Sequence, residues 1–275
     1  MTRLPRSVLA VCALVLVFAA GCSSWVGLLA QPTPLGPDEI LARSLARLET
    51  AATFHVEAKI GGSVKAGSLG SIAGGIPIGL LGNIKLDGAT MTGDVDVPNR
   101  AAHALASFPS LFGMTAEVVL ADGYTYTKIS LLGDKFTRSK APASLSAAGT
   151  GPDATLGFID AVGQVRSVLE SSGTVATLVG RDTVDGLDAY HLAVTVPQDG
   201  LKRLFQDAGG AAAAGLDVQV APFDYWVYVD TLRPARIEVK ASSATIGSID
   251  LDMTLTGYDQ PVKIAAPPAS KVNGT

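Results

Sequence analysis

The chain contains very little cysteine. Its 275 residues include only Cys12 and Cys22, and Cys12 lies in an amino-terminal segment that has the pattern of an export signal. If that segment is removed before Cys22, no intramolecular disulfide can form, even in an oxidising compartment. The sequence therefore predicts a fold that is held together by its hydrophobic core.

The chain also lacks any strong excess of positive charge. It carries 21 basic and 25 acidic residues, for a formal net charge of −4, and no basic cluster is present. Both nucleic-acid binding and electrostatic attachment to anionic lipids need such a cluster. We therefore expect no nucleic-acid partner.

Residues that commonly perform catalysis are scarce. The histidines are His55, His103 and His191, none of which forms a pair at metal-binding spacing. The nucleophile-elbow pattern G-x-S-x-G and the dinucleotide pattern G-x-G-x-x-G are both absent from the sequence. Asp250 and Asp252 share the polar side of one expected strand, where they serve solubility. The sequence predicts a binding protein rather than an enzyme, with no metal and no cofactor.

The amino terminus has the three parts of a lipoprotein signal. Arg3 and Arg6 precede the apolar run Val8–Ala20, and small residues up to Gly21 stand immediately before Cys22. The run is shorter than the about 20 residues that a membrane-spanning helix needs. We expect residues 1–21 to be removed and Cys22 to carry a diacylglyceryl group. The alternative is an ordinary secretory signal with an incidental cysteine.

The composition after Cys22 predicts a tether, one domain and a tail. Residues 22–37, rich in proline near their end, are expected to link the acylated cysteine to the domain. Two acyl chains would anchor the protein stably on the outer face of the cell membrane, because a single chain binds only marginally. Residues 38–267 are expected to form one domain, followed by a flexible tail at 268–275.

The domain shows mainly the alternation of β-strands. Residues 249–255 are the clearest case, because Ile249, Leu251, Met253 and Leu255 alternate with polar residues. Similar patterns predict strands at 54–60, 84–86, 91–97, 114–121, 124–132, 175–179, 189–196, 225–229 and 236–240. Helices are expected from residue 37 to 48, from 156 to 169 and, briefly, from 200 to 207. The predicted class is α+β, with one strongly curved antiparallel sheet wrapped over helices.

One segment, Gly61–Gly82, departs from this pattern. It is too rich in glycine for a stable helix and too apolar for an ordinary surface loop. We predict that its apolar side chains lie at the mouth of a cavity: Ile76, Ile78, Leu80 and Leu81. The alternative is that the segment folds back onto the core.

Four segments of the domain occur in a recognisable order: Val119–Tyr126, Gly180–Leu192, Tyr225–Asp230 and Tyr258–Ile264. Together they resemble the mycobacterial LppX/LprAFG lipoprotein family. The resemblance extends from about residue 38 to residue 267 and implies a half-barrel that holds acylated lipids in a cavity between sheet and helices. It also implies transport of lipids or lipoglycans toward the outer envelope, with an envelope lipid exporter as a candidate partner.

Because the resemblance implies a lipid-binding cavity, the apolar faces of the strands are its expected lining. We predict that Phe158, Val162 and Val165 of the expected helix face the strand containing Tyr190, Leu192 and Val194. The other wall residues are expected to be Tyr225, Val227, Ile237 and Met253. Periodicity alone favours a filled core for these residues, and it is the resemblance that favours a cavity. The alternative function is therefore a lipid-anchored interaction or scaffold protein without a ligand.

The anchor gives the first testable prediction. Cys22→Ala should abolish acylation, because no other cysteine survives cleavage after Gly21. Metabolic labelling with an alkyne fatty acid measures the effect. Equal labelling of the wild type and the variant would contradict the lipoprotein assignment.

Overall fold

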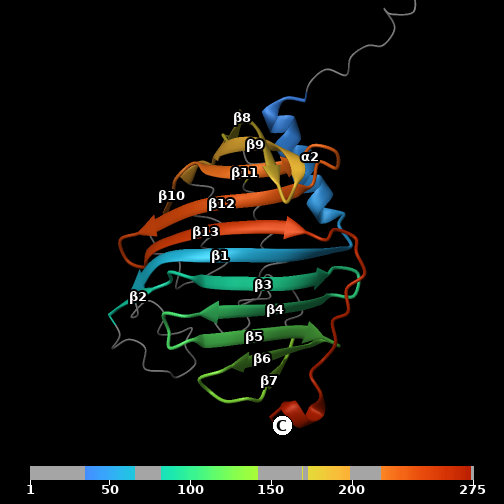
Figure 1. Ribbon diagram of the computed structural model, residues 1–275, viewed down its shortest axis with the longest axis vertical. Helices are drawn as coiled ribbons and strands as arrows, with labels where there is room; N and C mark the ends of the chain where they lie inside the picture. The colour runs from blue at the N-terminus through green and yellow to red at the C-terminus, as the bar shows by residue number, and fades with distance from the viewer. Residues whose placement is uncertain (1–34, 66–81, 142–168, 170–172, 199–217, 274–275) are drawn as a thin grey trace, which may run out of the picture. The chain divides into compact units, whose positions relative to one another are not determined.

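The computed structural model describes residues 35–65, 82–141, 169, 173–198 and 218–273. The chain divides into two compact units, residues 1–36 and Pro37–Thr275, and the fold of the second unit is described below. This unit is mostly β-structure, with one α-helix and one large antiparallel sheet among the described residues (Figure 1).

The sheet has 13 strands, of which eleven follow one another in the order β7-β6-β5-β4-β3-β1-β13-β12-β11-β9-β8. The short strands β2 and β10 pair with β1 and β12. The bounds are β1 Thr53–Lys65, β2 Asn83–Lys85, β3 Ala89–Asp96, β4 Ala101–Phe108, β5 Met114–Ala121, β6 Tyr124–Ile129, β7 Thr137–Lys140, β8 Val175–Val184, β9 Leu187–Thr195, β10 Val218–Val220, β11 Phe223–Tyr228, β12 Pro234–Ser243 and β13 Gly247–Thr256.

Helix α2, Pro37–Glu49, begins where the sequence predicts. Proline at the first position and the acidic residues Asp38 and Glu39 in the first turn suit a helix amino terminus. Its buried side comprises Ile40, Leu41, Ser44, Leu45 and Leu48. This side contacts β8, β11 and β12, so the helix covers one end of the sheet (Figure 1). No helix in the described ranges is long and apolar enough to cross a membrane.

Two tight hairpin turns are built on Asp-Gly pairs. Asp122 and Gly123 join β5 to β6, and both have positive φ angles, 55° and 75°. Asp185 and Gly186 join β8 to β9 in the same way, with φ angles of 49° and 78°. Left-handed backbone at both central residues matches the twist of the flanking strands.

Strands β4, β7 and β10 were not predicted from the sequence. The residues of β4 are alanine-rich, and alanine has a low strand propensity. Strand β7 has no apolar alternation of its own, but its residues pair with β6. Pairing with long neighbours stabilises these segments more than their own composition does.

The expected interruption at Gly61 is wrong for its first five residues. Strand β1 continues to Lys65 and pairs with β13 throughout. Glycine makes this pairing possible, because a Cβ on Gly62 would lie 2.3 Å from the carbonyl oxygen of Ser248, and one on Gly247 would lie 2.0 Å from that of Ser63. The rest of the glycine-rich segment, residues 66–81, lies outside the described residues, as do most of the expected helix 156–169 and all of 200–207.

The carboxyl-terminal segment returns to the far edge of the sheet. Tyr258 donates a hydrogen bond to the carbonyl of Pro234 at 2.8 Å. Residues Ala269–Lys271, expected in the tail, form a 3₁₀-helix, and Val272 pairs with Phe136 beside β7. The segment therefore spans from the middle of the sheet to its edge (Figure 1).

The glycine contact between β1 and β13 gives a stability prediction. Gly247→Ala should destabilise the domain by at least about 3 kcal/mol. The strain of a φ angle of +121° costs about 1–3 kcal/mol, and the overlap of the new methyl group with backbone atoms adds to it. Gly180→Ala is the matched control, since nothing lies within 4 Å of its Cβ position and its effect should stay within about 1 kcal/mol. Urea denaturation compares the two variants. Equal stability of both would contradict the close approach.

Candidate functional site

The two faces of the sheet differ in chemistry. In antiparallel strands, directly opposed residues project from the same face. Leu192 pairs with Tyr225, Tyr225 with Ile237, Ile237 with Met253 and Met253 with Ala58. These five residues form one apolar row across the sheet, and we call the side from which they project the apolar face.

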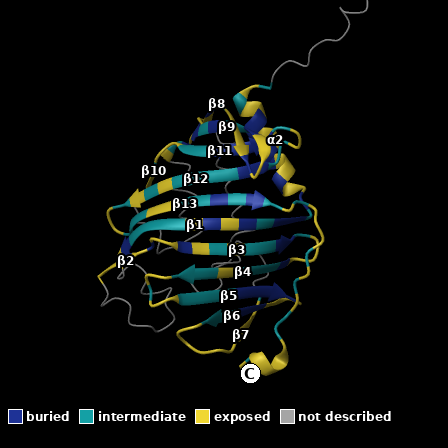
Figure 2. Ribbon diagram, viewed as in Figure 1, coloured by how far each residue is buried: buried dark blue, intermediate teal, exposed yellow. Residues whose placement is uncertain are grey.

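The apolar face continues across the other half of the sheet. Val56, Val95, Ala102 and Leu120 extend it through β1, β3, β4 and β5 by the same pairing rule. Its middle strands carry apolar side chains that are only half-buried (Figure 2): Met91, Ala102, Ala104, Ala106, Ile237, Val239 and Leu251. Small side chains along β4 leave more room above the sheet than leucine or phenylalanine would.

The predicted wall residues that can be located all belong to this face, but they differ in exposure. Leu192, Val194, Tyr225 and Val227 are at most 1% exposed. The other three, Tyr190, Ile237 and Met253, are half-buried or just within the buried range. The structure therefore groups the strand residues, and their contact with a lipid stays a prediction. Phe158, Val162, Val165, Ile76, Ile78, Leu80, Leu81 and Cys22 lie outside the described residues.

A buried hydrogen bond ties α2 to this face. The hydroxyls of Ser44 and Tyr225 are 3.1 Å apart, and both residues are essentially inaccessible. Burial raises the pKa of Tyr225 above its ordinary value, and the hydrogen bond from Ser44 opposes part of that rise. The phenol is therefore neutral and fixes the helix over β11.

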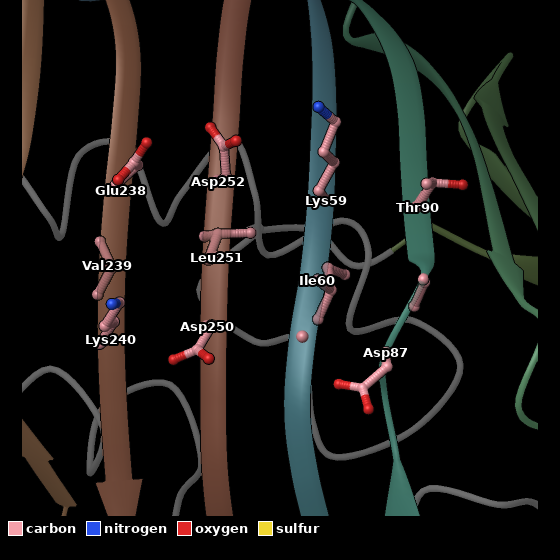
Figure 3. Close-up of a pocket in the computed structure, with 13 residues that line it drawn as sticks. Lys59, Ile60, Asp87, Thr90, Glu238, Val239, Lys240, Asp250, Leu251 and Asp252 are labelled. Atoms are coloured by element: carbon pink, nitrogen blue, oxygen red, sulfur yellow. The ribbon is translucent and has the colours of Figure 1, made fainter.

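A hollow of about 430 Å³ lies among β12, β13, β1 and the start of β3 (Figure 3). Apolar residues Ile60, Val239 and Leu251 line it together with charged ones. The charged residues are Lys59, Lys240, Asp87, Glu238, Asp250 and Asp252. The charged side chains of β1, β12 and β13 project from the opposite face to Ile60, Val239 and Leu251, and Glu238 and Asp252 both pair with Arg236.

The opposite, polar face carries the three histidines. The side chains of His55 and His191 are 32% and 18% exposed, so both are partly covered by their neighbours. His55 Nδ1 lies 2.7 Å from Asp94, and His191 Nε2 lies 2.7 Å from Asp224. The ring of His191 also stacks on that of Trp226, with 4.3 Å between the ring centroids. The indole N–H of Trp226 donates a hydrogen bond to Asp182 at 2.9 Å. These contacts order the strands.

The third histidine belongs to an ion-pair group. His103 Nε2 lies 3.1 Å from Glu117, which also pairs with Lys128. Burial raises the pKa of Glu117, but the hydrogen bonds and charges of Lys128 and His103 outweigh it, so the pKa lies below its ordinary value. Glu117 is thus a carboxylate at neutral pH. Across the described ranges, no cluster of three His, Cys, Asp or Glu side chains could hold a metal.

Of the comparisons with known proteins, the one with solved structures finds a match. No family model matches the chain, and no curated protein matches it. The crystal structure of the Mycobacterium tuberculosis lipoprotein LppX matches with a TM-score of 0.50 at 17% sequence identity, covering 83% of this chain and 97% of LppX. This chain has the fold of LppX. The resemblance seen in the sequence is therefore confirmed as a likeness of fold.

The likeness to LppX does not by itself identify a ligand site. Part of the apolar face was also not predicted from the sequence. Ala102, Ala104 and Ala106 were not assigned to any strand, because β4 was not recognised. The alternation of these alanines with His103, Leu105 and Ser107 is the signal that could have placed them.

The Ser44–Tyr225 pair gives a prediction about this face. Tyr225→Phe should cost about 1–3 kcal/mol of stability, because it leaves the buried Ser44 hydroxyl without its partner. Combining it with Ser44→Ala should cost less than the sum of the two single changes. Thermal unfolding of the wild type, the two single variants and the double variant gives the double-mutant cycle. Strict additivity would show that the two hydroxyls do not interact.

Proposed function

We propose that the chain is a membrane-anchored lipoprotein that binds acylated lipids or lipoglycans in an apolar cavity and carries them across the cell envelope. The cavity would lie between the sheet, curved as a half-barrel, and helices that cover its apolar face. An acylated lipid or glycolipid is the ligand, and the acylated Cys22 holds the carrier at the outer face of the cell membrane. An envelope lipid exporter is the proposed partner.

The single observation that carries this proposal is the continuous apolar face with its half-buried middle. Among the described residues, α2 is the one α-helix on this face, and it contacts β8, β11 and β12 at one end. The half-buried side chains of β3, β4, β12 and β13 lie beyond that end. An acyl chain would cover the part of these side chains that remains exposed.

The energetics suit a lipid rather than a polar ligand. Each buried methylene contributes about 0.8 kcal/mol without directional contacts. Discrimination by chain length is therefore weak, and selectivity would come from the head group at the mouth. Phe158, Val162 and Val165 are proposed to supply the wall opposite the sheet, and Ile76, Ile78, Leu80 and Leu81 the mouth.

The likeness to LppX, a lipoprotein by its description, supports the same class of function. The polar face supports a role without catalysis. Its histidines pair with carboxylates at the surface of the strands, and the described residues assemble neither a nucleophile with its base nor a metal site. A binding role needs none of these groups.

A matched pair on β4 tests the proposal. Ala104 lies on the apolar face and is half-buried, whereas its neighbour Leu105 projects to the polar face and is 42% exposed. Ala104→Trp should displace acyl chains and lower the binding of a fluorescent fatty-acid probe at least tenfold, which corresponds to about 1.4 kcal/mol. Leu105→Trp should bind the probe as the wild type does.

The stability of the two variants separates the carrier from the alternative of a filled core. In a cavity, the added indole occupies free space and the melting temperature changes little. In a filled core, Ala104→Trp overpacks the interior and costs about 1–3 kcal/mol. A large loss of stability, with no probe bound by any of the three proteins, would refute the proposed function.

A further inference from the structure

Two neighbouring turns at one end of the sheet expose large apolar side chains. Phe112, in the turn between β4 and β5, is 83% exposed, and Leu131 and Leu132, between β6 and β7, are 50% and 62% exposed. The two turns are joined directly: Ser130 N–H donates to the carbonyl of Thr115, and Thr115 N–H donates to Ser130 Oγ, both at 2.9 Å. We call Phe112, Leu131 and Leu132 the apolar tip.

The framework of the domain holds the tip outward. Leu111 packs against the cluster of Val64, Ile84 and Leu86, and Ser110 Oγ donates to the carbonyl of Lys85. The next residue, Phe112, has a φ angle of +56°, a region that bulky side chains rarely adopt. The anchored backbone thus keeps an aromatic ring in solvent at a conformational cost. The ring is 83% exposed, so packing against the described part of the chain offsets little of that cost.

The tip is also free of charge. Residues 108–116 and 129–133 contain no Asp, Glu, Lys or Arg. Moving them out of water therefore requires no desolvation of an ionised group. Exposed apolar groups of this kind mark contacts with proteins or membranes.

The size and position of the tip favour a membrane. Three side chains on two turns cannot supply the about 800 Å² per partner that a stable protein interface buries, whereas a few apolar side chains suffice to enter a bilayer surface. The root of the tip is also continuous with the apolar face: Leu111 and Phe108 join the same cluster as Ile60, and Ile60 pairs with Leu251.

We infer that the apolar tip inserts into the surface of a phospholipid bilayer and sets this end of the apolar face against the lipid. The inference rests on the proposed function, since it places the acyl-chain site where chains could enter from the membrane. Because the tip is uncharged, insertion needs no anionic lipid and is insensitive to salt.

The test uses the acylated protein in phosphatidylcholine vesicles whose acyl chains are brominated. An environment-sensitive fluorophore is attached to Leu132→Cys. The matched control is the same label on Leu187→Cys, which is similarly exposed at 57%. The strand pairings place Leu187 at the opposite end of the sheet, because β9 begins at the end where β1 begins and β6 ends where β1 ends.

We expect the label at position 132 to shift to the blue and to be quenched by the brominated lipid, while the label at 187 does neither. Adding Phe112→Ser and Leu131→Ser to the labelled variant should lower the ratio of inserted to free tip by roughly tenfold for each change. The melting temperature should stay unchanged, because both side chains are exposed.

Equal solvent exposure of the two labels overturns the inference. A blue shift at position 132 that is already present in detergent without vesicles, together with a doubled mass, also overturns it and assigns the tip to a second copy of the chain. Bound acyl lipid is measured in the same samples by mass spectrometry. If the protein binds acyl lipid but the label at position 132 does not insert, only the inference about the apolar tip is refuted. If the label inserts but no acyl lipid is bound, the proposed function is refuted and the inference about the tip is supported.

Discussion

The fold depends on one constraint, the need to shield an apolar sheet face that extends from β5 to β9. Its rows run through paired residues such as Leu192, Tyr225 and Ile237, so the apolar surface is continuous. Exposure of a surface of this size would make the chain aggregate. Helix α2 covers the end at β8, β11 and β12, where its buried Ser44 bonds to Tyr225. The remaining, half-buried part of the face gives the molecule its proposed capacity to hold acyl chains.

The two faces of the sheet are stabilised by different interactions. The polar face is crosslinked by pairs such as His191 with Asp224 and Arg236 with Asp252, which lie 2.7 Å and 2.8 Å apart. Such partly exposed pairs contribute little to stability individually, and the same face also carries two hydrophobic clusters, one around Trp226 and Tyr228 and one around Val119 and Tyr126. The apolar face carries small residues such as Ala104 along β4.

Much of the sheet could be predicted from the sequence because its strands alternate strongly. The alternation of Leu251, Met253 and Leu255 predicts β13. The pair Asp122–Gly123 is typical of a hairpin turn, and the structure has a turn there. The alanine-rich β4 could not be recognised, because its strand state depends on pairing with β3 and β5. Similarly, the continuation of β1 through Gly62 depends on the close approach of β13, a tertiary contact that no local pattern encodes.

The candidate site was predictable only in part. Alternation identified which strand residues share a face, and the family resemblance, not the alternation, suggested a cavity above them. The polar contacts of Tyr225 and the exposed position of Phe112 could not be read from residue types, since each depends on segments distant in sequence or on backbone conformation.

The most direct test of the central claim is native mass spectrometry of the protein purified from its own host in mild detergent. The account predicts discrete adducts at one lipid per protein, beyond the mass of the acylated chain itself, and an acylated lipid in the organic extract. A single unliganded species, with no lipid in the extract, would contradict the claim that the apolar face holds a ligand.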